Sequence, residues 1–266
     1  MVTHIIDEKL KQMQFNAAMA LYSSRGVYRG FGYLVALAII SSQVVLVYLV
    51  VPYSIGLFAQ LLVFMCAYLC TDFINGLTHM YMDHNDHYDS LAGPLIANFH
   101  LHHKIPKYKI NPILIVYFVE TGSKLWLVVY LAMVMAILCM FPINPMLAYF
   151  LVYVGILSSI AEVSHYLCHT SNSRLTLMFS KCGLLLSKKH HARHHLEDNV
   201  NYAFLNGWSD QFLNLIAKQF IKVTKTLLSV ITPTMILYLP ELMQEWPVST
   251  LVNLPRNDSL ACIAPV

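Results

Sequence analysis

The sequence is poor in charged residues. Asp, Glu, Lys and Arg make up 12% of its 266 residues, whereas soluble globular domains contain roughly 25%. Hydrophobic residues make up 57%, and the net charge of +3 is too small to indicate a nucleic-acid partner. This composition excludes an ordinary soluble domain and favours an integral membrane protein.

Two other features are missing. The 6 cysteines form no CxxC pair and mostly have apolar neighbours, so they indicate small buried residues and not a disulfide framework. The first thirty residues lack the uninterrupted apolar core of a cleavable signal peptide. They predict instead an N-terminal interfacial segment at 1–30, followed by a membrane-embedded domain at 31–240 and a C-terminal tail at 241–266.

Four apolar runs are long enough to cross a bilayer, which takes about 20 residues of helix. The third run, Leu125–Phe141, is short, and the apolar stretch Ile113–Val119 before it would lengthen it. Leu175–Leu186 and Phe212–Leu239 are interrupted by lysines and Pro233, so they indicate interfacial or peripheral helices. The fold class is therefore all-α, with about four transmembrane helices. The predicted spans are Phe31–Val51, Ser54–Ile74, Leu125–Phe141 and Met146–Leu167.

Lys and Arg are absent from the two short loops that join these spans, near Val51–Tyr53 and Pro142–Pro145. Every Lys and Arg can lie on the opposite side together with both termini, and the positive-inside rule makes that side the cytoplasm. All 13 histidines except His4 then gather at this face, from four distant segments of the chain. We therefore expect a histidine-rich site at the cytoplasmic face of a bacterial inner membrane or of the endoplasmic reticulum.

The spacing of these histidines suits metal binding. His165 and His169 share one face of a helix because residues four apart are neighbours, and His79 and Asp83 repeat this spacing. A lone histidine near a membrane end is usually a satisfied polar residue or an interfacial anchor. A convergent set is different, because imidazole is the commonest metal ligand. Eight or more histidines exceed the roughly four ligands of a zinc site, so they favour a dinuclear centre.

Helical periodicity divides the four histidines of the segment KKHHARHH, residues 188–195, between two faces of a helix. His191, His194 and His195 share one helix face, whereas His190 lies about 100° from His191. This arrangement makes His191, His194 and His195 ligands and makes His190 a spectator or an outer partner. The alternative pairs His190 with His194 and leaves His191 spare.

Five motifs resemble those of the Kua, or lipid-desaturase-domain, family and occur in the family's order over residues 72–210. They are DFINGLTHMYMD (72–83), FHLHH (99–103), FVETG (118–122), HYLCH (165–169), and KKHHARHH followed by NYAFLNGW (188–208). The resemblance implies two iron ions, with Asp83 a ligand or an outer partner of the histidines. The implied metal-site residues are His79, Asp83, His102, His103, His165, His169, His191, His194 and His195.

The resemblance also implies a reaction and its partners. O2 would serve as co-substrate for the removal of two hydrogens from the acyl or alkyl chain of a membrane lipid, giving a double bond and water. Electrons would come from a donor of the cytochrome b5 or ferredoxin type. Carboxylates commonly orient metal-bound imidazoles. Further candidates, as extra ligands or outer partners, are His84, His87, His100, His190, Asp72, Glu120, Glu162 and Asn201.

Two departures leave the substrate open. One branch of the family carries additional histidines where this chain has Ile115–Tyr117 and Asp198–Asn199, so another lipid, or hydroxylation instead of desaturation, remains an alternative. Two other classes of protein account for the histidines less well. A membrane zinc hydrolase needs about three protein ligands, and a metal transporter would place its ligands near the middle of the membrane.

Overall fold

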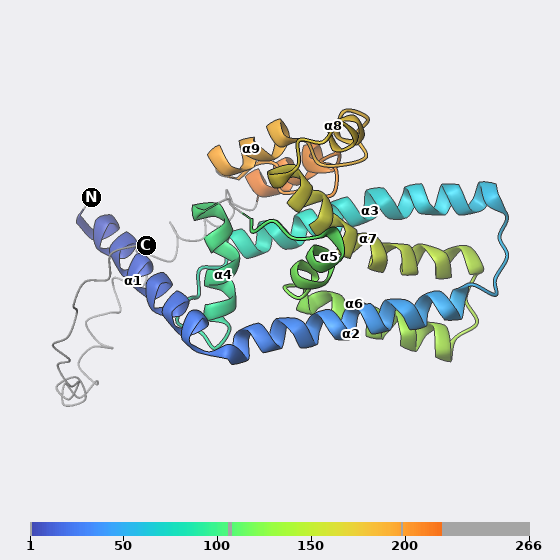
Figure 1. Ribbon diagram of the computed structural model, residues 1–266, viewed down its shortest axis with the longest axis horizontal. Coiled ribbons are helices and arrows are strands. Elements are labelled where there is room, and N and C mark those ends of the chain that lie inside the picture. The colour runs from blue at the N-terminus through green and yellow to red at the C-terminus, as the bar shows by residue number, and fades with distance from the viewer. Residues whose placement is uncertain (1, 106–107, 198, 220–266) are drawn as a thin grey trace. The chain divides into compact units, whose positions relative to one another are not determined.

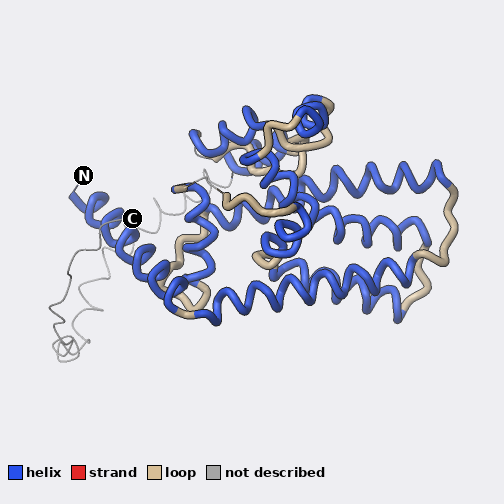
Figure 2. Tube along the Cα trace, in the orientation of Figure 1, coloured by secondary structure: helices blue, strands red, loops and turns tan. Residues whose placement is uncertain are grey.

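The computed structural model describes residues 2–105, 108–197 and 199–219, and these form helices and connecting loops without a strand (Figure 2). The all-α fold class is therefore confirmed. Residues 210–219 are also helical. The other helices are α1 (Val2–Ser24), α2 (Gly26–Val50), α3 (Leu57–Asp83), α4 (Gly93–Lys104), α5 (Ile113–Thr121), α6 (Leu125–Met140), α7 (Pro145–Thr170), α8 (Arg174–Lys181) and α9 (Lys188–Leu196).

Three helices, α2, α3 and α7, are long and apolar enough to cross a membrane. Helices α5 and α6 form a fourth candidate span only if they are counted together, because the chain bends by 87° between them. The predicted lengthening of the third span by Ile113–Val119 thus takes the form of a separate helix, α5, which joins α6 as one span only across this bend. Gly122 lies at the bend, where a Cβ atom would come within 2.4 Å of the Gly32 carbonyl oxygen. Only glycine allows this approach of the α5 end to α2.

Both hairpin loops lie at the same end of the helical bundle. The loops 51–56 and 141–144 lie at one end of the long helices (Figure 1). Helix α7 packs against α3, α5 and α6, and α2 packs against α5 and α6. Buried Ile39, Leu131 and Val152 tie α2, α6 and α7 together. Ala67 and Leu157 join α3 to α7, with Leu205 of the loop after α9 packed in the same cluster.

The observed helices begin and end at residues other than those of the predicted apolar segments. Helix α3 continues past Ile74 to Asp83, which carries its polar last turns beyond the apolar run. In the stretch Leu175–Leu186, helix α8 ends at Lys181 and the chain then turns, with Leu186 buried. Of the stretch Phe212–Leu239, residues 212–219 are helical. The remainder and the tail 241–266 lie outside the described residues, and the proposed domain boundaries stay predictions.

Candidate metal centre

Four helices bring the predicted ligands together at one end of the bundle. His79 and Asp83 lie in the last turns of α3, and His165 and His169 lie in the last turns of α7. Helix α4 ends with two adjacent histidines, and α9 contributes three more. These residues are His102, His103, His191, His194 and His195.

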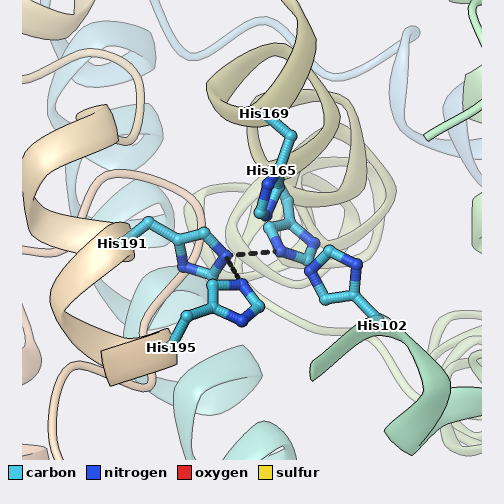
Figure 3. Close-up of side chains that lie close together, drawn as sticks. All are labelled: His102, His165, His169, His191 and His195. Carbon is cyan, nitrogen blue, oxygen red and sulfur yellow. Dashed lines mark hydrogen bonds between the residues drawn. The ribbon is translucent and has the colours of Figure 1, made fainter. Parts of the chain in front are cut away.

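The nine residues divide into two groups. In each group, one potential ligand atom per residue lies within 4.8 Å of those of all other members. The five-histidine group comprises His102, His165, His169, His191 and His195 (Figure 3). The mixed group comprises His79, Asp83, His103 and His194. The groups are neighbours, since the rings of His103 and His195 have centroids 5.0 Å apart.

Imidazole nitrogens face one another inside the five-histidine group. The Nε2 atom of His191 lies 2.8 Å from Nε2 of His165 and 3.0 Å from Nε2 of His195 (Figure 3). Ligand nitrogens at about 2.0–2.1 Å from one ion are themselves about 3 Å apart. Nε2 of His102 and Nε2 of His169 are buried without a hydrogen-bond partner. Unpartnered buried nitrogens at this spacing fit a metal ion.

The mixed group is built around the Asp83 carboxylate. Its Oδ1 lies 3.0 Å from Nε2 of His103 and 3.6 Å from Nε2 of His79, and its Oδ2 lies 3.5 Å from Nε2 of His194. Asp83 Oδ1, His103 Nε2 and His194 Nε2 are all buried without a partner in hydrogen-bond geometry. Three imidazoles and a carboxylate are a donor set that suits iron or zinc.

Backbone carbonyls fix two of these imidazoles from outside. Nδ1 of His79 lies 2.9 Å from the carbonyl oxygen of Tyr202, and Nδ1 of His194 lies 2.8 Å from that of Val200. An Nδ1–H that donates to a carbonyl leaves Nε2 unprotonated and turned toward the metal position. Sequence reasoning missed both contacts, because a backbone carbonyl has no residue-type signature.

Asp72 supports the loop between α9 and the helical segment 210–219, the loop that carries the Tyr202 and Val200 carbonyls. It was predicted to be an extra ligand or an outer partner of an imidazole, but its hydrogen bonds go to this loop instead. The carboxylate accepts hydrogen bonds from the backbone N–H groups of Leu205, Asn206, Gly207 and Ser209, and from the Ser209 hydroxyl. Its side chain is fully buried, so five donors offset the cost of burying its charge.

Asn201 likewise shapes the loop instead of contacting an imidazole. Asn199 and Asn201 both adopt a left-handed backbone conformation, with φ of 66° and 60° respectively. The side-chain amide of Asn201 donates to the His190 carbonyl oxygen over 3.1 Å. The loop that carries the Tyr202 carbonyl is thereby tied to α9.

The remaining predicted histidines lie outside both groups. His84 contacts the Met80 carbonyl and Asn199, and His100 contacts the Tyr88 hydroxyl and the Met82 carbonyl. His87 is exposed. Nε2 of His190 lies 2.5 Å from Asp210 Oδ2.

The two glutamates differ in their relation to the histidines. Glu162 Oε2 lies 3.9 Å from Nδ1 of His165, while its Oε1 pairs with Lys124. No hydrogen bond among the described residues joins Glu120 to an imidazole, although Glu120 lies near enough to Glu162 to interact with its charge.

Burial favours the neutral, metal-binding form of three of these imidazoles, those of His102, His191 and His195. Burial, reinforced by neighbouring histidines, lowers the pKa of His195 to about 3. The same causes place the pKa of His102 and that of His191 well below the ordinary value of 6.5. Because metal ions compete with protons for imidazole, neutral imidazoles favour metal binding.

Three helices apolar enough to cross a membrane, and two adjacent groups of convergent histidines, indicate a helical membrane protein with a candidate metal site. The sequence profile of the lipid desaturase domain matches residues 68–234. The chain belongs to the lipid desaturase domain family, which confirms the resemblance seen in its motifs. No curated protein and no solved structure matches the chain. Membership suggests a desaturase-type oxidoreductase that acts on lipids.

Proposed function

We propose that the protein is an O2-dependent membrane lipid desaturase that holds two iron ions. The carrying observation is the division of nine donor residues into two adjacent groups with unpartnered, buried ligand atoms. One ion would lie in the five-histidine group and the other in the mixed group. A single zinc ion would use about four of these donors and leave the rest without partners.

A bound iron pair would supply the O2-dependent oxidising power needed to remove hydrogen from an unactivated methylene. In the overall reaction, –CH2–CH2– and O2, with two electrons and two protons, give –CH=CH– and two molecules of water. The lipid chain supplies two of the four electrons that reduce O2. The other two come from a donor of the cytochrome b5 or ferredoxin type.

The chain's own residues orient the ligands and exclude water. Carbonyls of Tyr202 and Val200 hold His79 and His194 in one tautomer. The buried ring of Phe204 packs against His79 and His165, with centroid distances of 5.3 and 5.5 Å. An apolar wall of this kind keeps bulk water from the reacting carbon and strengthens nearby electrostatic interactions.

The position of the site supports this function over its rivals. The ligands of α3 and α7 lie at the helix ends, whereas a transporter would place them near the middle of the membrane. Hydroxylation would use the same donors, and membership of the desaturase domain family favours desaturation. We also propose that the site faces the cytoplasm, because the opposite loops 51–56 and 141–144 contain no Lys or Arg.

The test is metal content combined with lipid analysis. Purified protein should contain two iron ions per chain. With reductant and O2, it should convert a membrane lipid into a product two hydrogens lighter by mass spectrometry. His102→Ala, in the five-histidine group, and His103→Ala, in the mixed group, should both abolish conversion. Equal anaerobic and aerobic rates, or full activity with one zinc, would contradict the proposal, and a product one oxygen heavier would indicate hydroxylation.

A further inference from the structure

Lys124 lies inside the helical bundle, where an ammonium group is costly. Its side chain is only 4% exposed. Nζ forms an ion pair with Glu162 Oε1 at 3.1 Å and donates to the Ser158 carbonyl at 2.6 Å and to the Asn75 side-chain oxygen. The sequence had placed this lysine among the basic residues of the cytoplasmic side. Because ionisable groups within membrane-spanning bundles usually mark function, its burial calls for a role.

The bend between α5 and α6 brings Lys124 to this position. Lys124 directly precedes α6, at the point where the chain turns by 87°. Its partners belong to two other helices, since Asn75 is on α3 while Ser158 and Glu162 are on α7. One ammonium group therefore joins three parts of the bundle, about one helical turn before His79 on α3 and His165 on α7.

Glu162 connects Lys124 to the five-histidine group. Its Oε2 lies 3.9 Å from Nδ1 of His165, and the Tyr108 hydroxyl lies 3.3 Å from the same nitrogen. The other ring nitrogen of His165, Nε2, faces His191. The Tyr108 hydroxyl is thus within hydrogen-bond distance of the outer nitrogen of this imidazole, the Glu162 carboxylate lies next to that nitrogen, and the inner nitrogen points into the group.

We propose that Lys124 is a positioning residue of the five-histidine group. It holds the Glu162 carboxylate beside His165 and offsets its charge, so that the His165 ring keeps Nε2 directed at the metal position. The inference rests on the proposed function only in requiring a metal site at this group. The mixed group takes its outer contacts from the Tyr202 and Val200 carbonyls, so Lys124 should affect the two groups unequally.

A double variant that removes both charges separates the effect of Lys124 on protein stability from its effect on the metal site. Removing only one member of a buried ion pair leaves an unpaired buried charge, which destabilises a protein strongly. Removing both members avoids that penalty. Lys124→Met and Glu162→Gln should therefore each lower the unfolding temperature, and the double variant should recover most of the loss. The double variant still lacks the carboxylate beside His165, so its metal binding should remain impaired.

Gln43 provides a matched control. Its side chain is 5% exposed and joins α2 to α7 through the Gly155 carbonyl and the Ser159 hydroxyl, but it contacts none of the nine ligands. Gln43→Met removes a buried polar link of the same bundle. It should lower the unfolding temperature without changing metal affinity.

The experiment titrates Co2+ into the metal-free full-length protein and follows visible absorption alongside thermal unfolding. Comparison with His165→Ala identifies the signal of the five-histidine group. Lys124→Met, Glu162→Gln and the double variant should weaken this site by about 10- to 100-fold, the usual effect of losing an outer partner. The mixed group should keep its affinity.

Three results would overturn the inference. They are unchanged Co2+ binding in the double variant, equal weakening of both sites, and absence of Co2+ binding at the five-histidine group of the unmodified protein. Because Co2+ binding needs neither iron nor turnover, the proposed function is tested separately. A protein that shows the unequal weakening but does not desaturate lipid would retain the role of Lys124 and lose the proposed reaction.

Discussion

His190 and His191 are neighbours in the chain but point to different partners. Nε2 of His191 lies 2.8 Å from Nε2 of His165, inside the five-histidine group. Nε2 of His190 instead contacts Asp210, in the helical segment 210–219. Successive residues of a helix are about 100° apart, so one turn of α9 cannot direct both rings into the same site. The geometry favours His191 over His190 as a ligand, and the ligand role itself stays a prediction.

Alanine substitution at these neighbours should have opposite consequences. His191→Ala should lose metal from the five-histidine group and abolish lipid desaturation, because a ligand is removed. His190→Ala should keep measurable turnover while losing about 1–3 kcal/mol of unfolding free energy, because buried Asp210 loses a hydrogen-bond partner. Iron content, turnover and thermal unfolding of both variants provide the measurement. An inactive His190→Ala beside an active His191→Ala would show that the ligand face of α9 is assigned one residue out of phase.

Sequence periodicity predicts the parts of the site that lie within single helices. The spacing of His165 and His169 on α7, and of His79 and Asp83 on α3, follows from the helical repeat alone. Periodicity does not assign partners between helices. His102 and His103 are adjacent at the end of α4 but belong to different groups, and this division depends on where α4 meets α3, α7 and α9.

Other features have no signal in one sequence. The 87° bend after α5 depends on the contact between Gly122 and the Gly32 backbone, which are far apart in the chain. Lys124 resembles any other basic residue near a membrane end until its partners on α3 and α7 are known. Asp72 was expected near an imidazole, because a carboxylate on the histidine stripe of α3 fits that role. Its actual partners are backbone N–H groups that the sequence does not distinguish.

Asp72→Asn should destabilise the loop that follows α9. Asparagine keeps one accepting oxygen and turns an amide N–H2 group toward backbone donors, so we expect a loss of about 3 kcal/mol in unfolding free energy. Because this loop carries the Tyr202 carbonyl that orients His79, metal affinity of the mixed group should also fall. Thermal unfolding and Co2+ titration measure both effects. Asp89→Asn, at an exposed position, is the control and should leave both unchanged.

Cysteine labelling tests the orientation of the site. Tyr53 lies in the hairpin after α2, and Lys189 lies at the start of α9. In a background with the native cysteines replaced, Lys189→Cys should react with a membrane-impermeant maleimide only after the cytoplasmic side is opened. Tyr53→Cys should react in intact cells, or in sealed vesicles whose outer surface is the non-cytoplasmic side of the membrane. The reverse pattern would place the histidines on the non-cytoplasmic side and refute the proposed topology.

The stability of the metal-free protein should fall as the pH is lowered below about 6.5, the ordinary pKa of histidine. Burial lowers the pKa of His195 to about 3 and that of His191 well below its ordinary value. Between these values the unfolded chain binds protons that the folded protein does not. Acid therefore favours unfolding, and stability is progressively lost as the pH falls toward 3.

Unfolding temperatures of metal-free protein at pH 8, 6.5 and 5 in one detergent test this dependence. His191→Leu should show a shallower decline, because it removes a buried imidazole that must be neutral in the folded state. His87→Ala, at an exposed position, should follow the unmodified protein. Bound metal should move the decline to lower pH, since protons must then displace the ion from its imidazoles. An unfolding temperature that stays constant from pH 8 to 5 in the metal-free protein would mean that these histidines are not held neutral by the fold.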